Sequence, residues 1–104
     1  MITADINGLK QLNQDYGHSR GDETIITVTE VMRSCFPDGE IFRLSGDEFV
    51  IIAMNQEYEG FMKHVREMGL ELDSQTPNGV SLGATWVEHL TDFDMLLHLS
   101  LIHI

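Results

Sequence analysis

The feature that most constrains the fold of this chain is a hairpin-like segment near its middle. Residues 40–44 and 49–54 both read as extended, and only the turn Ser-Gly-Asp-Glu at residues 45–48 separates them. A short glycine-containing turn between two such runs is typical of a β-hairpin. The turn also places Asp47 and Glu48 side by side, although neighbouring like charges repel. The segment therefore predicts paired strands and poses the question of what the two carboxylates do.

The rest of the chain alternates between strand and helix patterns. Asp22 or a neighbour is expected to cap the helix over residues 23–36, where apolar residues recur at helical spacing. The lone Cys35 belongs to that apolar stripe and is interpreted as a core residue. The other predicted elements are a strand over 1–6, a short helix over 9–13, a loop over 16–22, a helix over 57–70, a strand over 80–87 and a last helix from near Thr91.

This order predicts an α+β fold, a ferredoxin-like βαββαβ sandwich with a mostly antiparallel sheet. In that topology the first two strands run parallel through a right-handed crossover, and the third strand inserts between them, antiparallel to both. The end of the first strand, at Asp5, then lies at the same sheet edge as residues 45–48. Asp5 and Asp47 are thus expected to be neighbours, and a hard divalent cation is the usual means of holding such a pair together.

Composition narrows the classes of partner. Seventeen Asp and Glu against six Lys and Arg give a formal net charge of −11. Such a chain is poorly suited to long nucleic acids, whose binding depends on cationic side chains, but it is compatible with a nucleotide accompanied by a metal ion. The sequence shows no signal peptide or transmembrane segment, so no membrane contact by this domain is expected. The predicted location is the cytoplasm, with tethering through other parts of a parent protein left open.

Four segments carry a more specific signal. They are D-I-N-G-L-K-x-x-N from Asp5, Y-G-H-x-x-G-D from Tyr16, R-x-S-G-D-E-F from Arg43 and V-S-L-G from Val80. In order and spacing they resemble the motifs of the GGDEF domain, the diguanylate cyclase family. The resemblance covers residues 1–97 as a partial domain, incomplete at both ends, and leaves 98–104 as an atypical apolar tail, a truncated reading frame or foreign sequence.

The resemblance implies a palm-type fold that binds GTP and Mg²⁺, with Mn²⁺ as a second candidate ion. Two such domains, a homodimer, would face each other and condense two GTP into cyclic di-GMP, releasing two pyrophosphates. By matched position, Asp5, the Ile6 carbonyl and Asp47 would hold the metal. Asp47 would also help to deprotonate the attacking hydroxyl, with Glu48 beside it as the second catalytic candidate.

The resemblance also implies substrate contacts. The start of the short helix would contact the phosphates, and two polar side chains would recognise guanine. Guanine offers its N1–H and its exocyclic amine as a pair of donors, and adenine has no such pair. His18 would either line the same pocket or bond to nearby backbone. By position the substrate-binding residues are Leu9, Lys10, Asn13, His18 and Asp22, with the backbone N–H groups around Gly8.

Four departures from the family pattern qualify these expectations. Ser45 replaces the first glycine of the signature, and residues 36–39 read Phe-Pro-Asp-Gly where an inhibitory product site would need Arg-x-x-Asp. The family's N-terminal helix is absent. The closing motif A-D-x-A-L-Y-x-A-K is also missing, because the chain from His98 has no Lys or Arg and drops the expected final strand. An N-terminal sensory domain is expected to be missing from this fragment.

Other functions compete with a cyclase. A degenerate, inactive GGDEF domain acting as a GTP-binding or regulatory module fits the missing ends, and retention of the site residues opposes it. An EF-hand calcium loop counted from Asp5 fails, because it would have Lys10 and Tyr16 where glycine and glutamate are required. A ferredoxin-like interaction domain without a site would leave the four ordered motifs unexplained.

Overall fold

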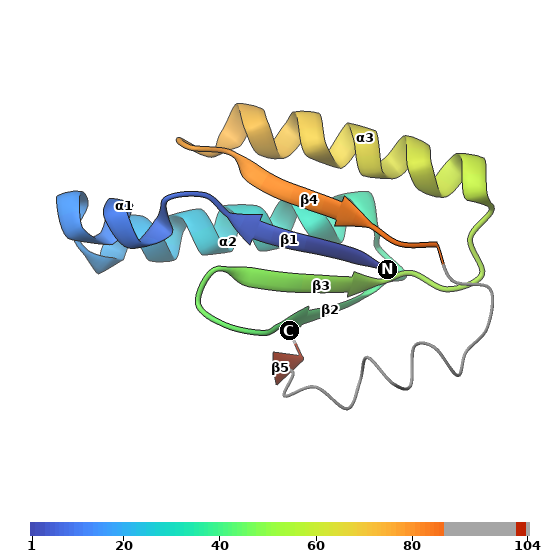
Figure 1. Ribbon diagram of the computed structural model, residues 1–104, viewed down its shortest axis with the longest axis horizontal. Coiled ribbons are helices and arrows are strands. Elements are labelled where there is room, and N and C mark those ends of the chain that lie inside the picture. Colours follow the sequence, from blue (N-terminus) through green and yellow to red (C-terminus); the bar gives the residue numbers. More distant parts are fainter. Residues whose placement is uncertain (87–101, 104) are drawn as a thin grey trace.

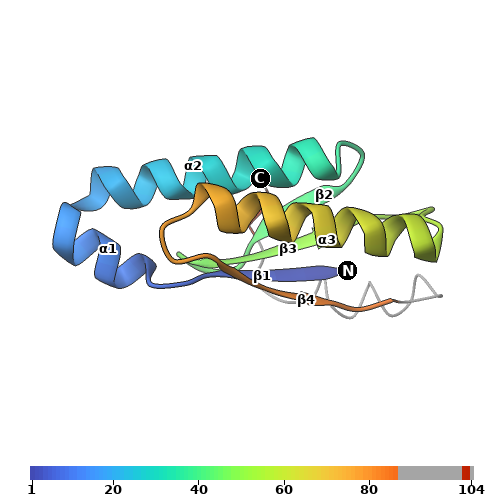
Figure 2. The same ribbon diagram turned by 90° about the horizontal axis from the view of Figure 1, so that it is seen from above.

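The computed structural model describes residues 1–86 and 102–103. Helices α2 and α3 cover one face of a single sheet, which confirms the α+β sandwich (Figure 2). The elements are β1 (Ile2–Ile6), α1 (Leu9–Tyr16), α2 (His18–Cys35), β2 (Glu40–Arg43), β3 (Glu48–Ile52), α3 (Tyr58–Gln75), β4 (Val80–Ala84) and β5 (Ile102–His103).

The sheet has the strand order β4-β1-β3-β2-β5, and the neighbouring strands pair antiparallel. Strand β3 lies between β1 and β2, so β1 and β2 run parallel, as predicted. Three connections therefore meet at one end of the sheet, namely β1–α1, β2–β3 and α3–β4 (Figure 1). We call this end the loop edge. The α2–β2 and β3–α3 connections lie at the opposite edge.

Burial follows the strand and helix periods. In β1 the residues Ile2, Ala4 and Ile6 are buried and Thr3 and Asp5 are exposed, the alternation of a strand with one face on the core. In β3 both faces are covered, which explains the unbroken apolar run of its sequence. The largest fully buried side chains are Phe49, Phe61, Ile2, Met32, Ile51, Met68, Leu72 and Val28.

The start of α2 differs from the expectation. The helix begins at His18, with Gly17 before it at φ 83°, so Asp22 lies inside the helix and the prediction that it forms the N-cap is wrong. Two glycines made this stretch read as a loop. Gly21 nevertheless lies within the helix, and a Cβ there would overlap the Asn13 side chain. Glycine at this position therefore leaves room for the Asn13 side chain where α1 packs against α2.

Two further elements differ from the prediction, namely the end of α3 and the presence of β5. Helix α3 continues past the predicted end at residue 70, because Leu72 extends its apolar stripe and is fully buried. The short strand β5 pairs with β2, although the sequence was expected to lack a final strand. β2 offers an otherwise unpaired strand edge, with which a further strand can pair. The last helix predicted from Thr91 lies outside the described residues, as does most of the predicted tail at 98–104. No described helix has the length and apolar character needed to cross a membrane.

Candidate active site

The loop edge is held together by main-chain hydrogen bonds between segments that are distant in sequence. The Ile6 N–H donates to the Asp47 carbonyl at 2.8 Å, and the Asn7 N–H donates to the Gly79 carbonyl at 3.1 Å. These bonds join the end of β1 to the β2–β3 turn on one side and to the α3–β4 connection on the other (Figure 1). The two acidic segments singled out in the sequence are thus brought together.

Asp5 and Asp47 form a close pair of like-charged side chains. Partial desolvation, the nearby Asp47 charge and a hydrogen bond between the two carboxyl groups raise the pKa of Asp5 above its ordinary value. Across the β1–β3 ladder Asp5 stands opposite Glu48, a second like charge. Within residues 1–86 and 102–103 no Lys or Arg forms an ion pair with any of these three carboxylates. Within the described region neither carboxylate of the pair is therefore neutralised by a direct ion pair.

The β2–β3 turn is braced by Arg43, a residue to which the sequence reasoning gave no role although it opens the signature motif. Its Nε donates to the Ser45 carbonyl at 3.0 Å and its Nη2 to the Gly46 carbonyl at 2.9 Å. The guanidinium also lies 5.9 Å from the centre of the Phe49 ring. Ser45, the departure from the family glycine, donates its hydroxyl to Asp47 Oδ1 at 3.2 Å. The Arg43 guanidinium is thus bonded to the carbonyls of the turn, and no ion pair joins it to Asp47.

Helix α1 presents an open N-terminus beside this pair. Gly8 takes the left-handed conformation, φ 67°, and no side chain caps the helix. The first N–H groups of such a helix and its dipole favour an anion. Leu9 is buried, whereas Lys10 is exposed in the first turn and makes no ion pair among the described residues. This start of α1 is suited to phosphate.

The predicted guanine-reading residues come from α1 and α2. Asn13 lies against Gly21, and its Oδ1 atom is buried without a hydrogen-bond partner in the described part of the chain. Asp22 is exposed in α2, its carboxylate free of hydrogen bonds and ion pairs to described residues, and His18 is exposed at the helix start. An unpaired buried acceptor is costly, and a donor-bearing ligand relieves the cost. No hydrogen bond joins the described side chains of Asn13 and Asp22.

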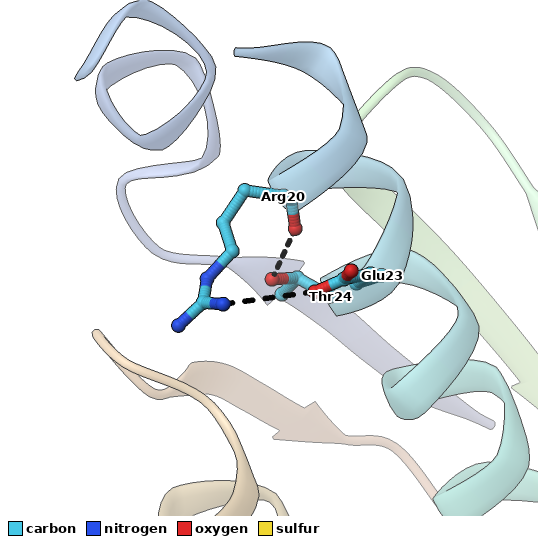
Figure 3. Close-up of polar contacts among 3 residues, drawn as sticks. All are labelled: Arg20, Glu23 and Thr24. Atoms are coloured by element: carbon cyan, nitrogen blue, oxygen red, sulfur yellow. Dashed lines mark hydrogen bonds and ion pairs between the residues drawn. The ribbon is translucent and has the colours of Figure 1, made fainter. Parts of the chain in front are cut away.

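The residues flanking Asp22 are engaged with each other, as Figure 3 shows. Arg20 Nη1 lies 3.7 Å from Glu23 Oε2, and the Thr24 hydroxyl donates to the Arg20 carbonyl at 3.0 Å. Both charged side chains of this pair are well exposed, so its contribution to stability is small. The nearby cation is thus directed to Glu23 and leaves the Asp22 carboxylate available.

The donors at the loop edge fit a hard divalent cation. Two carboxylates and a main-chain carbonyl are oxygen ligands, and Mg²⁺ is commonly bound by one or two carboxylates with substrate phosphates. Within the described ranges no group of three or more His, Cys, Asp and Glu side chains has the geometry to hold a metal alone. A depression of about 370 Å³ over β1, β3 and β4 includes Asp5 and Glu48 in its wall. The site is thus suited to a metal that shares its ligands with a bound anion.

The opposite edge carries a separate depression of about 490 Å³. Its wall contains Phe36, Asp38 and Gly39 from the turn before β2, together with His64 and Glu67 from α3. These turn residues occupy the positions where the family resemblance would require Arg-x-x-Asp. The depression therefore has Phe36 at the position where a site for a diphosphate product would need a guanidinium, and its wall also contains the carboxylates of Asp38 and Glu67.

Comparison with known proteins agrees with this geometry. The family model described as diguanylate cyclase, GGDEF domain, matches residues 1–94. The chain is 33% identical over 106 residues to diguanylate cyclase DgcP of Escherichia coli K12, covering 90% of this chain and 30% of DgcP. It is 36% identical over 53 residues to diguanylate cyclase DgcM of the same strain, covering 50% of this chain and 13% of DgcM. The chain thus spans less than a third of either relative.

Solved structures give the same family. The GGDEF domain of DgcB from Caulobacter crescentus, in complex with c-di-GMP, superposes with a TM-score of 0.67 at 26% identity, over 79% of this chain and 55% of that one. The active GGEEF domain of a Vibrio cholerae diguanylate cyclase shares the fold, with a TM-score of 0.64 at 23% identity, over 88% and 65% of the two chains. From the family match, the relatives and the fold, the chain belongs to the GGDEF domain family of diguanylate cyclases.

Proposed function

We propose that this chain binds GTP with Mg²⁺ and that two copies facing each other condense two GTP into cyclic di-GMP. The observation that carries the proposal is that the main chain at the end of β1 is bonded to the β2–β3 turn, which brings Asp5 close to Asp47, while neither carboxylate forms an ion pair with a Lys or Arg of the described region. A fold gains nothing in stability from such a pair, since neighbouring like charges oppose each other. A ligand that brings a divalent cation removes the conflict.

Asp5, Asp47 and the Ile6 carbonyl would hold the metal. When bound, Mg²⁺ neutralises phosphate charge and aligns the reacting groups. The N–H groups at the start of α1 and the Lys10 amine would bind the phosphates, which lie next to the metal in any nucleotide complex. The base would then reach toward the junction of α1 and α2.

Guanine recognition falls to Asp22 and Asn13. A free carboxylate at Asp22 accepts from the N1–H and the exocyclic amine of guanine together, and adenine lacks that pair of donors. The Oδ1 atom of Asn13, which has no hydrogen-bond partner among the described residues, is an acceptor for a donor on the base. His18, exposed at the start of α2, is placed to border the same space.

The reaction forms a bond from the 3′-oxygen of one GTP to the α-phosphorus of the other. The bond from that phosphorus to the oxygen bridging to the β-phosphate breaks, and pyrophosphate leaves. Asp47, with Glu48 beside it, accepts the proton of the 3′-hydroxyl. The 3′-hydroxyl of the second nucleotide then attacks the α-phosphorus of the first in the same way, which releases a second pyrophosphate and closes the ring. Each ring therefore needs two domains that both carry GTP.

The wider setting is also a proposal. GTP is abundant in the cytoplasm, so we place the domain there. A further relative, an uncharacterized membrane protein of Staphylococcus aureus USA300, is 30% identical over 104 residues, which is 90% of this chain and 28% of that protein. A longer parent protein would supply a sensory domain and, where present, a membrane tether. No polymeric nucleic acid is proposed as a partner.

The test is to incubate the chain with GTP and Mg²⁺, and in parallel with Mn²⁺, and to separate the products by chromatography. Cyclic di-GMP and pyrophosphate should appear in a ratio of one to two. Asp47→Asn keeps the shape but removes a metal ligand and a proton acceptor, so the rate should fall on the order of a thousandfold or more. Undiminished turnover in that variant would contradict the assignment of Asp47. GTP binding without any turnover would favour the degenerate regulatory module instead.

A further inference from the structure

Asn7 lies between the proposed metal ligands and the phosphate-binding start of α1, and one distant segment engages both its main-chain N–H and its side-chain amide. Its N–H donates to the Gly79 carbonyl at 3.1 Å, and its Nδ2 donates to the Asn78 carbonyl at 3.3 Å. Its Oδ1 accepts a hydrogen bond from the Ser81 hydroxyl at 2.8 Å. Three bonds therefore connect one residue of the β1–α1 loop to the entry of β4.

The same two segments approach closely at the next residue. A Cβ atom at Gly8 would stand 2.7 Å from Asn78 Nδ2, so the Asn78 side chain packs directly on the loop. Gly8 and Gly79 both take positive φ values, 67° and 77°, which glycine adopts without strain. Each of the two contacting segments therefore has a glycine whose backbone conformation permits the close approach.

We propose that Asn7 and Ser81 are positioning residues that hold residues 8–10 ready for the phosphates of the nucleotide. The inference rests on the proposed function and adds a role for the V-S-L-G segment, which the binding residues leave without one. Helix α1 has no side-chain cap, so its first turn depends on contacts made outside the helix. A loop ordered before binding loses less conformational entropy when the ligand arrives, which strengthens binding.

The chemistry of residue 7 makes the proposal specific for asparagine. Its amide donates to one partner and accepts from the other. An aspartate would still accept from Ser81, but it cannot donate to the Asn78 carbonyl and would set another negative charge near Asp5. The exposed serine of β4 completes the pair as a donor, a role that threonine also fills and alanine does not.

The test combines amide hydrogen exchange of the free chain, read by NMR, with GTP titrations in Mg²⁺. Exchange of the Asn7 and Leu12 N–H groups reports the loop directly, because they donate to the Gly79 and Gly8 carbonyls. Asn7→Ala should speed this exchange about tenfold and raise the Kd for GTP by a similar factor. Ser81→Ala, which changes an exposed side chain in a strand, should raise both the exchange rate and the Kd for GTP about threefold to fivefold. Ser81→Thr should return both to the values of the unaltered chain.

Ser74→Ala is the matched control. It removes an exposed serine hydroxyl that donates to the Glu71 carbonyl at 2.8 Å within α3, and it should change neither quantity. Unchanged exchange and unchanged Kd in Asn7→Ala and Ser81→Ala would overturn the proposal, as would failure of Ser81→Thr to restore them. Should the unaltered chain fail to bind GTP, the proposed function falls, and the exchange rates alone decide whether Asn7 and Ser81 hold the loop.

Discussion

The two edges of the sheet are built in opposite ways. At the loop edge three connections that are distant in sequence meet (Figure 1). Main-chain hydrogen bonds join them, and the like-charged carboxylates of Asp5 and Asp47 lie close together. At the opposite edge, aromatic rings pack, with Phe36 6.0 Å from Phe61 and 5.9 Å from His64 between ring centres. The turn before β2 is closed locally, by the Gly39 N–H donating to the Phe36 carbonyl at 3.0 Å.

The contrast separates the sources of stability from the sources of binding. Buried rings contribute hydrophobic free energy and fixed packing, and no ligand is needed to complete them. The carboxyl pair and the uncapped helix start are incomplete without a cation and an anion. Substitutions at the two edges should therefore affect different measurements.

The largest effect is expected from Phe61→Ala at the aromatic edge. Phe61 is 1% exposed, and removal of a buried phenyl ring should lower the free energy of unfolding by about 3–5 kcal/mol. Tyr58→Ala, on the same helix but 50% exposed, should cost much less. Chemical denaturation of both variants checks this. Equal losses would show that the aromatic edge is not the stabilising one.

At the loop edge, Asp22→Ser should change nucleotide choice rather than stability. Because Asp22 lies inside α2 and caps nothing, its loss should leave unfolding nearly unchanged. Unpaired guanine donors cost about 1–3 kcal/mol, so affinity for GTP should fall about tenfold and the preference over ATP should shrink. Glu23→Gln, which breaks only the exposed pair with Arg20 (Figure 3), is the control. An unaltered ratio of GTP to ATP affinity in the serine variant would remove Asp22 from guanine recognition.

A smaller effect concerns pH. The pKa of Asp5 is raised in the folded chain, so the folded state binds more protons between the ordinary value of 3.8 and the raised one. Stability contributed by this group thus falls as pH rises through that window, and the loss persists at neutral pH. Asp5→Asn should therefore raise the free energy of unfolding at pH 7 by less than about 1 kcal/mol, because the site is exposed, and should raise the melting temperature accordingly. Below about pH 3 it should change neither. A lower melting temperature at pH 7 would contradict the strained pair.

The smallest expected signal is from cyclic di-GMP at the opposite edge. The depression there has Asp38 and Glu67 in its wall, and carboxylates repel a cyclic diphosphate. Calorimetry should therefore show little heat on addition of the product. Tight binding that is lost in Asp38→Ala would place a product site where the sequence predicts none.

Much of the fold followed from the sequence because the hairpin and the crossover leave few topologies. The antiparallel insertion of β3 alone predicts that Asp5 and Asp47 meet. Other features depend on packing that local patterns do not show. Gly21 reads as a helix breaker until Asn13 is seen against it, and the start of α2 was misplaced for that reason.

The hydrogen bonds that support the candidate site could not be predicted from the sequence either. Arg43 stands in the signature motif, but its bonds to turn carbonyls depend on the turn's conformation. Ser81 reaches Asn7 across 74 residues of sequence, a pairing that only the register of β1 with β4 creates. The spacing of a motif shows that such residues belong to it, but it does not predict which atoms they contact in the fold.

The most direct test of this account is a GTP titration of the chain with Mg²⁺ and with EDTA, repeated on Asp47→Asn. If the carboxyl pair binds the cation that accompanies the nucleotide, GTP should bind at least tenfold more tightly with Mg²⁺, and Asp47→Asn should abolish most of that gain. Equal affinity in Mg²⁺ and EDTA, or an Asp47→Asn variant with the full Mg²⁺ dependence, would contradict it.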